Sequence, residues 1–153
     1  MSNLGKGSFA NNTPPDYVSV GNYSSIAQGV YYHDGTDNHL CVKNRKCVFT
    51  TNWGQPIEEG GTHIGNDVWI GKDVRIMYGV NIGDGAIIGA YTVVSKDVPP
   101  FAVVVGNPQR ITRFRFTPEQ IAKLLKIKWW DRDNMYEHRE ELWDIDEFLK
   151  NNE

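Results

Sequence analysis

Four histidines are the side chains of this sequence best suited to proton transfer near neutral pH: His33, His39, His63 and His138. An imidazole with a pKa of about 6.5 can take the proton from a hydroxyl or amine as that group attacks an electrophile. Histidine is also a ligand of zinc, and a catalytic zinc site needs three protein ligands around one ion. Which of these two kinds of chemistry the four histidines can perform therefore depends on where the fold places them.

A six-residue repeat dominates the middle of the chain, from Ile64 to Pro99. Large aliphatic side chains recur at one position of the repeat and smaller ones recur four residues later: Ile64, Ile70, Ile76, Ile82, Ile88 and Val94 in the first column, and Val68, Val74, Val80, Ala86, Thr92 and Val98 in the second. A helix would repeat at about 3.6 residues, and a single strand of this length would be far too long. A hexapeptide repeat of this kind indicates a parallel β-helix.

Each repeat then supplies one short strand and one corner of a triangular coil. Three repeats complete a coil, so residues 18 apart should stack, with Ile64 on Ile82, Ile70 on Ile88 and Ile76 on Val94. Glycine, Asn and Asp in the corners allow the backbone angles of a tight turn. The residues themselves leave the handedness of the rod open.

A weaker copy of the same pattern precedes the main repeat. Val20, Ile26 and Tyr32 lie six residues apart, and a companion column follows from Val18 through Ser24 to Val30. The register then breaks for the 31 residues from His33 to His63. We expect β-helix coils over residues 17–32 and 64–99, with residues 33–63 as a projecting loop. Long irregular loops in compact domains are often functional.

The C-terminal third reads as an exit from the rod followed by helices. Pro99 and Pro100 cannot donate ladder hydrogen bonds, so we expect the coils to end there and residues 100–116 to lead away. Thr117, Pro118 and Gln120 fit the N-cap, N1 and N3 positions of a capping box, which predicts a helix from residue 117. A second helical stretch is expected at about Asn134–Leu142 and a short third one after it. We interpret residues 117–153 as a lid over the open edge of the last coil, and residues 1–153 as one domain.

This arrangement separates the histidines. On the repeat pattern His63 points outward and is interpreted as a surface residue, and His138 is expected to be exposed in the terminal helices. The repeats from Ile64 to Pro99 contain no histidine, so a zinc site of three histidines within the coils is excluded and no metal is expected. His33 and His39 fall in the loop, where one of them can act as a base.

The composition of the chain excludes some classes of function. A net charge of −3 gives no electrostatic reason to expect nucleic acid as a partner. No apolar run reaches the roughly 18 residues of a membrane span. The first residues lack the apolar stretch of a secretory signal, and we expect Cys41 and Cys47 to be reduced thiols in a cytoplasmic protein.

Four segments resemble the hexapeptide-repeat, left-handed β-helix acyltransferases, above all the xenobiotic (chloramphenicol and streptogramin) acetyltransferase group and its saccharide-acetylating relatives. They are VGNYSSIAQGV, DNH, IGNDVWIGKDVRIMYGVNIGDGAIIGAYTVVSKDVPPFAVVVGNPQRITRFRF and IKWWD, which together cover roughly residues 18–131. The resemblance implies a left-handed rod, a homotrimer, acetyl-CoA as donor, and transfer of the acetyl group to a hydroxyl or amine without a metal.

The resemblance also assigns roles. It implies that His39 is the general base, with Asn38 beside it. Asp37 or Asp34 either orients the His39 ring or simply forms a turn. The positions that match the family's donor site are Trp69, Gly89, Ala90, Gly106, Asn107 and Pro108, and the alternative for Trp69 is packing between subunits. Lys96, Arg110 and Arg113 are either candidates for the phosphates of CoA or solvated surface residues.

The acceptor is the least determined part. The candidates to bind it are His33, Asp37 and Tyr32, although for His33 a packed corner position is the favoured interpretation. Tyr31, Tyr32, Phe49 and Trp53 offer aromatic faces to a sugar ring or a drug, or form the loop's own core. Because the N-terminus and the loop are shorter than in antibiotic-modifying members, a saccharide or sugar nucleotide is favoured over an antibiotic. Two other classes remain as alternatives: a non-catalytic β-helix scaffold, and a γ-type carbonic anhydrase, which the missing histidines disfavour.

Overall fold

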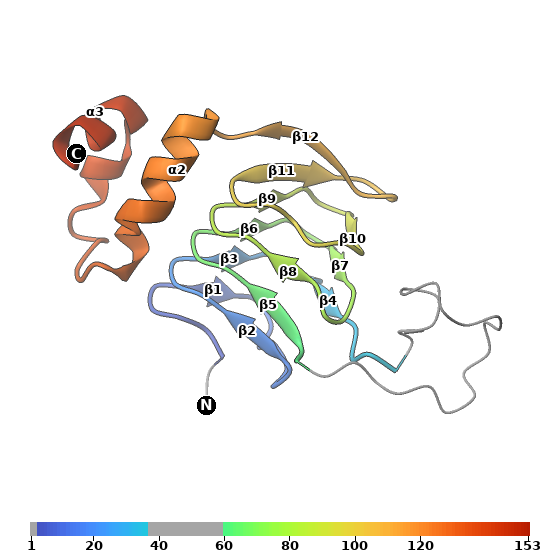
Figure 1. The fold of residues 1–153 in the computed structure, drawn as a ribbon. Helices are drawn as coiled ribbons and strands as arrows, with labels where there is room; N and C mark the ends of the chain where they lie inside the picture. The colour runs from blue at the N-terminus through green and yellow to red at the C-terminus, as the bar shows by residue number, and fades with distance from the viewer. Residues whose placement is uncertain (1–2, 37–59) are drawn as a thin grey trace.

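A computed structural model describes residues 3–36 and 60–153 of the chain (Figure 1). The described residues form a triangular rod whose three sides are parallel sheets, with helices packed along one side. Residues Asp37, Asn38, His39, Cys41, Cys47, Phe49 and Trp53 lie outside the described ranges. The predicted projecting loop is therefore described only at its two ends.

Three sheets make the sides of the rod, and each is built from strands that come from successive coils. The first sheet has the order β2 (Val18–Val20), β5 (Thr62–Ile64) and β8 (Asn81–Ile82). The second has the order β1 (Phe9–Ala10), β3 (Ser25–Ile26), β6 (Trp69–Ile70), β9 (Ile87–Ile88), β11 (Ala102–Val105) and β12 (Arg110–Phe114). The third has the order β4 (Tyr31–Tyr32), β7 (Arg75–Ile76) and β10 (Val93–Val94).

The predicted stacking is confirmed at each of the three pairs. Ile64 pairs with Ile82, Ile70 with Ile88 and Ile76 with Val94. Backbone hydrogen bonds run along the rod axis between these coils; for example, the Gly71 amide donates to the Ile88 carbonyl over 2.8 Å.

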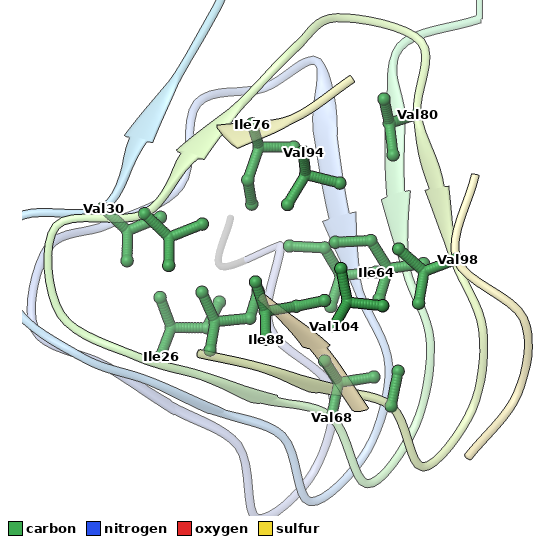
Figure 2. Close-up of a cluster of buried hydrophobic side chains, with 14 of the residues drawn as sticks. Ile26, Val30, Ile64, Val68, Ile76, Val80, Ile88, Val94, Val98 and Val104 are labelled. Carbon is green, nitrogen blue, oxygen red and sulfur yellow. The ribbon is translucent and has the colours of Figure 1, made fainter. Parts of the chain in front are cut away.

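The core of the rod is a single cluster of aliphatic side chains pointing inward from all three sheets (Figure 2). Ile70, Val74 and Ile76 have no exposed surface at all. Along each short strand an exposed or partly exposed residue alternates with a buried one, as the period of two in a β-strand requires. Stacking buries the apolar column of each coil against its neighbours, which one coil could not do alone.

Two coils extend the rod beyond the predicted limits. At the N-terminal end, Leu4 bridges to Val20 and Phe9 pairs with Ser25, so residues 4–10 form part of an extra coil. At the C-terminal end, Val104 pairs with Ile88, so the segment expected to lead away from Pro99 instead continues the second sheet. In both coils stacked residues lie 16 apart instead of 18, because each coil is two residues shorter.

The chain leaves the rod only after β11. It turns back, and β12 pairs antiparallel with β11, covering the free edge of the second sheet. The expectation that helices cover this open edge is therefore wrong for the second sheet, where a strand does so.

The first predicted helix is confirmed, and its start is as expected. Helix α2 (Pro118–Ile127) begins with Thr117 as N-cap, and the side chains of Thr117 and Gln120 complete a capping box. The helix predicted at Asn134–Leu142 is wrong in extent, because residues 134–138 form turns and only η2 (Arg139–Leu142) is a short 3₁₀ helix. A further 3₁₀ turn, η1 (Trp129–Asp131), follows α2, and α3 (Ile145–Asn151) ends the chain.

These helices form a second apolar cluster along one corner of the rod, which we call the C-terminal cap. Phe101, Leu124, Trp130, Phe148 and Leu149 are its buried residues. The Lys6 ammonium donates to the Asp131 carbonyl, so the cap also reaches the first coil. Figure 1 shows α2 and α3 beside the rod, on the side away from β4. Within the described ranges, no helix has the length and apolar character needed to cross a membrane.

Candidate functional site

The described part of the predicted acceptor site lies where β4 leads out of the rod. The His33 amide donates to the Ile76 carbonyl, which fixes the backbone at this point. The His33 ring packs edge-on against the Tyr31 ring, with centroids 4.9 Å apart. The Arg75 guanidinium lies over the Tyr31 ring, 5.0 Å from its centroid. His33 is half-buried, so both the packed and the ligand-binding interpretations fit its position.

Asp34 forms a turn. Its Oδ1 accepts hydrogen bonds from the Thr36 amide and the Thr36 hydroxyl, over 2.9 and 2.6 Å. These bonds stabilise the carboxylate and lower the pKa of Asp34. This geometry agrees with the turn-forming interpretation of Asp34.

Tyr32 does not face a surface where an acceptor could bind. Its side chain is part of the buried core of the rod, since the strand alternation turns it inward. Burial raises the pKa of Tyr32, because the phenolate form would lose its hydration. The expectation that Tyr32 binds the acceptor is therefore wrong for the described structure, and its exposed neighbour Tyr31 takes the outward position.

Tyr78 was not singled out from the sequence, yet it contacts both described ends of the segment between Thr36 and Gly60. Its hydroxyl accepts from the Gly61 amide over 3.1 Å. A Cβ on Gly35 would lie 3.0 Å from the Tyr78 ring, so this glycine lets the chain pass close over the aromatic face. Tyr17 packs against the same ring, with centroids 5.8 Å apart.

His63 lies on the outer face of the first sheet, as predicted. Its Nδ1 and the Ser19 hydroxyl are 2.6 Å apart, and both side chains are exposed. His138 is also exposed and lies 3.4 Å from the Glu141 carboxylate in the cap. Among the described residues, no group of three His, Cys, Asp or Glu side chains could hold a metal ion.

The residues predicted to bind the donor fall at two places. Trp69 is 57% exposed on the outer face of β6. Gly89 and Ala90 form the corner that follows β9, next to Gly71 in the coil below: a Cβ on Gly71 would meet the Ala90 backbone. Glycine at position 71 therefore lets the two coils pack closely at this corner, where Ala90 is exposed and Gly89 is partly exposed.

Lys96, Asn107, Pro108 and Arg110 gather at the C-terminal end of the rod, and Gln109 holds them together. The Gln109 side chain accepts from the Ser95 and Lys96 amides over 2.7 and 3.0 Å and donates to the Lys96 carbonyl over 3.1 Å. The Asn107–Pro108 peptide bond is cis. Asn107, Pro108, Lys96 and Arg110 are all exposed.

This cluster has the chemistry of an anion site, because it carries two exposed cations, Lys96 and Arg110. Gln109 was missed because a single glutamine in a loop carries no pattern of its own. The structure brings Lys96 to the 107–110 segment, whereas Trp69 lies on β6, three strands away from β12 in the same sheet. The predicted catalytic residues His39 and Asn38, and Asp37 beside them, lie outside the described ranges, so their roles stay predictions.

The repeat and the prism that it builds define a protein class. Residues 61–96 match the model of the bacterial transferase hexapeptide family, six repeats long. A serine acetyltransferase from Neisseria gonorrhoeae has a similar structure, with a TM-score of 0.55 over 78% of this chain and 40% of that protein, at 26% identity. The hexapeptide match and neighbours of this kind imply that the rod is a left-handed β-helix.

Individual relatives narrow the class. A chloramphenicol acetyltransferase from Klebsiella aerogenes is 51% identical over 133 residues, covering 80% of this chain and 63% of its own length. A probable macrolide acetyltransferase from Lysinibacillus sphaericus is 40% identical over 126 residues, covering 76% of this chain and 70% of its own length. A hexapeptide-repeat acetyltransferase from Vibrio cholerae, solved with acetyl coenzyme A, is 28% identical with a TM-score of 0.55 and covers 74% of this chain and 60% of that protein.

The chain belongs to the hexapeptide-repeat acetyltransferases, the family that includes these chloramphenicol and macrolide enzymes. It spans about 63% of the Klebsiella relative and 70% of the Lysinibacillus relative.

Proposed function

We propose that this protein transfers an acetyl group from acetyl-CoA to a hydroxyl or amine of a small acceptor. The observation that carries the proposal is the 40% identity to a probable macrolide acetyltransferase over 70% of that relative's length. The Vibrio neighbour, solved with acetyl coenzyme A, supports the donor.

The chemistry needs one base and a means of holding two substrates. His39 takes the proton from the acceptor as its oxygen or nitrogen attacks the thioester carbonyl. The tetrahedral intermediate collapses, the carbon–sulfur bond breaks, and the imidazolium returns the proton to the thiolate of CoA. Asn38 lies next to the base in the sequence and is a candidate donor to the oxyanion. His33 and Asp37 are the candidates for acceptor contacts.

The donor site is proposed along the corner that follows β9 and at the end of the rod. Trp69, Gly89 and Ala90 provide an exposed ring and a corner with small side chains for the pantetheine arm. Lys96 and Arg110 supply charge-assisted hydrogen bonds to the phosphates, beside Asn107 and Pro108. The Gln109 hydrogen bonds support this assignment, because they fix the backbone of Lys96 next to the 107–110 segment.

The acceptor is proposed to be an antibiotic hydroxyl of the amphenicol or macrolide kind. The shorter loop favours a saccharide, but relatives named chloramphenicol acetyltransferase reach 51% identity, and a saccharide enzyme is not among those relatives described above. Thiol release from acetyl-CoA, measured with chloramphenicol, a macrolide and several amino sugars as acceptors, distinguishes an antibiotic acceptor from a saccharide acceptor.

A homotrimer is proposed as the assembly, since parallel rods with flat sides pack well under cyclic symmetry. The outer face of the second sheet supports an interface there, because Phe9 and Trp69 are exposed on it, at 60% and 57% of their surfaces. Light scattering coupled to size-exclusion chromatography measures the assembly directly.

Replacing His39 tests the mechanism. We expect His39→Ala to lower turnover roughly 10²–10⁴-fold without changing the melting temperature. His138→Ala is the matched control, because that exposed histidine lies in the cap and should leave the rate unchanged. Equal rates for His39→Ala and the unmodified protein would remove His39 as the base, while absence of thiol release with every acceptor and donor tried would contradict acetyl transfer itself.

A further inference from the structure

A cavity of about 410 Å³ lies between the rod and the C-terminal cap, and none of the residues discussed for acetyl transfer lines it. We call it the cap pocket. Two of its lining residues, Asp67 and Phe101, lie at the corner between the first and second sheets. Its lining is mainly aromatic and aliphatic, with one carboxylate and one guanidinium: Asp67, Phe101, Arg115, Phe116, Leu124, Trp129, Leu142, Trp143, Ile145 and Phe148. A volume of this size suits a small organic molecule.

Asp67 is the charged exception in a column of corner residues. Tyr23, Asp67, Gly85 and Phe101 occupy equivalent corners of successive coils, all with a left-handed backbone and φ between 54° and 71°. Tyr23 and Phe101 pack into the cap as aromatic rings. Asp67 instead places a carboxylate beneath the cap, where burial raises its pKa despite the nearby Arg115.

The pair formed by Asp67 and Arg115 leaves much of its hydrogen-bonding capacity open. Arg115 Nη1 donates to Asp67 Oδ2 over 3.0 Å and to the Gly85 carbonyl over 2.8 Å. Within residues 3–36 and 60–153, no hydrogen bond engages Asp67 Oδ1 or Arg115 Nε and Nη2. A guanidinium has five donors and a carboxylate can accept on both oxygens, so one acceptor and up to three donors remain at the floor of the pocket.

Aromatic rings border the same space. The Arg115 guanidinium lies over the rings of Phe116 and Phe101, at 5.0 and 5.6 Å, which holds its plane in place. Trp143 lines the pocket but is 77% exposed, so a large flat ring stands open to solvent beside it. A planar ligand could stack on this ring while its polar edge reaches the floor.

We propose that the cap pocket binds a neutral, planar, aromatic molecule that presents a hydrogen-bond donor and an acceptor on one edge, as a primary aromatic carboxamide does. The carboxamide oxygen accepts from Arg115 and its amino group donates to Asp67. A neutral ligand fits because the two charges at the floor already cancel each other. The site is independent of the acetyl-transfer site, which lies at other corners of the rod.

Fluorine NMR titration of the full-length protein provides the test, with 3-fluorobenzamide as probe. Three probes with the same ring are the comparisons: 3-fluorotoluene lacks the polar edge, 3-fluorobenzoate is an anion and 3-fluorobenzamidine is a cation. We expect 3-fluorobenzamide to bind at least about fivefold more tightly than each of the other three. Equal binding of the amide and the toluene, stronger binding of either ion, or no saturable binding of the amide would overturn the proposal.

Two exposed aromatic residues of the cap supply a matched pair of variants. Trp143→Ala should weaken 3-fluorobenzamide binding roughly threefold to tenfold, because the stacking face is lost. Tyr136→Ala should leave it unchanged, since Tyr136 is 73% exposed but does not line the pocket. Both side chains are mostly exposed, so both variants should fold, and an equal effect of the two would place the probe elsewhere.

Discussion

Gly85 is the position where the junction between rod and cap can be tested most directly. Its φ of +71° lies in the left-handed region, and a Cβ there would overlap the ring of Phe101. Phe101 is 1% exposed and packs against Phe116 and Trp130, so the ring has little room to move. Gly85→Ala therefore has two costs: about 1–2 kcal/mol for the left-handed backbone and about 1–3 kcal/mol for overpacking. We expect a loss of about 3 kcal/mol in the free energy of unfolding and a melting temperature about 6–12 °C lower.

A double-mutant cycle with Phe101→Leu separates the two costs. The smaller side chain should relieve the overlap, so that Gly85→Ala costs only the backbone part, about 1–2 kcal/mol, in the Phe101→Leu background. Urea unfolding at one fixed protein concentration, followed by tryptophan fluorescence, measures all four proteins. If Gly85→Ala cost the same in both backgrounds, the overlap with Phe101 would not be the cause, and the described packing of the cap on this corner would be wrong.

Three further predictions follow from the described contacts. Ile70 is completely buried between Ile26 and Ile88, so Ile70→Ala should lower the free energy of unfolding, measured in urea, by about 2–5 kcal/mol. Ile87 lies on the outer face of the same sheet, so Ile87→Ala should lower it clearly less, and equal losses would contradict the inward stacking. Tyr78→Phe removes the hydroxyl that accepts from the Gly61 amide while keeping the ring. Amide hydrogen exchange at Gly61 should therefore accelerate, whereas exchange in the rod core should not. Unchanged exchange at Gly61 would show that this hydrogen bond is absent in solution. The raised pKa of Asp67 means that the folded state holds the carboxyl proton more tightly than the unfolded chain does. The contribution of Asp67 to stability should therefore fall as the pH rises from the ordinary pKa of 3.8 through the folded pKa. Asp67→Asn should abolish that part of the pH dependence of the melting temperature, and the same dependence in both proteins would refute the prediction.

The interior of the rod could be predicted from the sequence because its repeat is strict where the coils are regular. Ile64, Ile70 and Ile76 are each followed 18 residues later by an aliphatic residue, and a parallel stack of coils is the arrangement that buries all of these columns together. The capping box at Thr117 was predictable for a similar reason, since its signal is contained within four residues.

The ends of the rod could not be predicted, because the coils there are shorter. Shortening a coil by two residues keeps the inward side chains in register in space while destroying the six-residue period in the sequence. Val104 stacks on Ile88 at a spacing of 16, and Pro99 and Pro100, which suggested an exit, lie in the corner between Val98 and β11. The turns of residues 134–138 were mistaken for helix because polar and aromatic residues there also fit a helical period.

The candidate sites depend on long-range contacts that leave little trace in the sequence. Gln109 binds Lys96 across 13 positions, and Arg115 binds Asp67 across 48, so no local pattern links either pair. Tyr78 did have a usable signal: it lies 18 residues after Gly60, so the stacking rule places it beside the point where the chain rejoins the rod. An aromatic residue at that point of the stack is a reason to look for an anchor.

The three corners of the prism differ in what they carry, although the sides between them are built alike. One corner holds Tyr78 beside the ends of the segment that contains His39, a second holds Gly89 and Ala90, and the third holds the cap over Asp67. Corner side chains point away from the inward columns, so they can change without disturbing the stacking that stabilises the rod. An inward residue such as Ile70 is constrained by its neighbours in the coils on either side, whereas Asp67 is constrained only by the cap that covers it. A charged residue at a corner where equivalent coils carry Tyr23 and Phe101 is thus not required by the rod, and the reason for it must lie in what it contacts: Arg115 and the open space beside it.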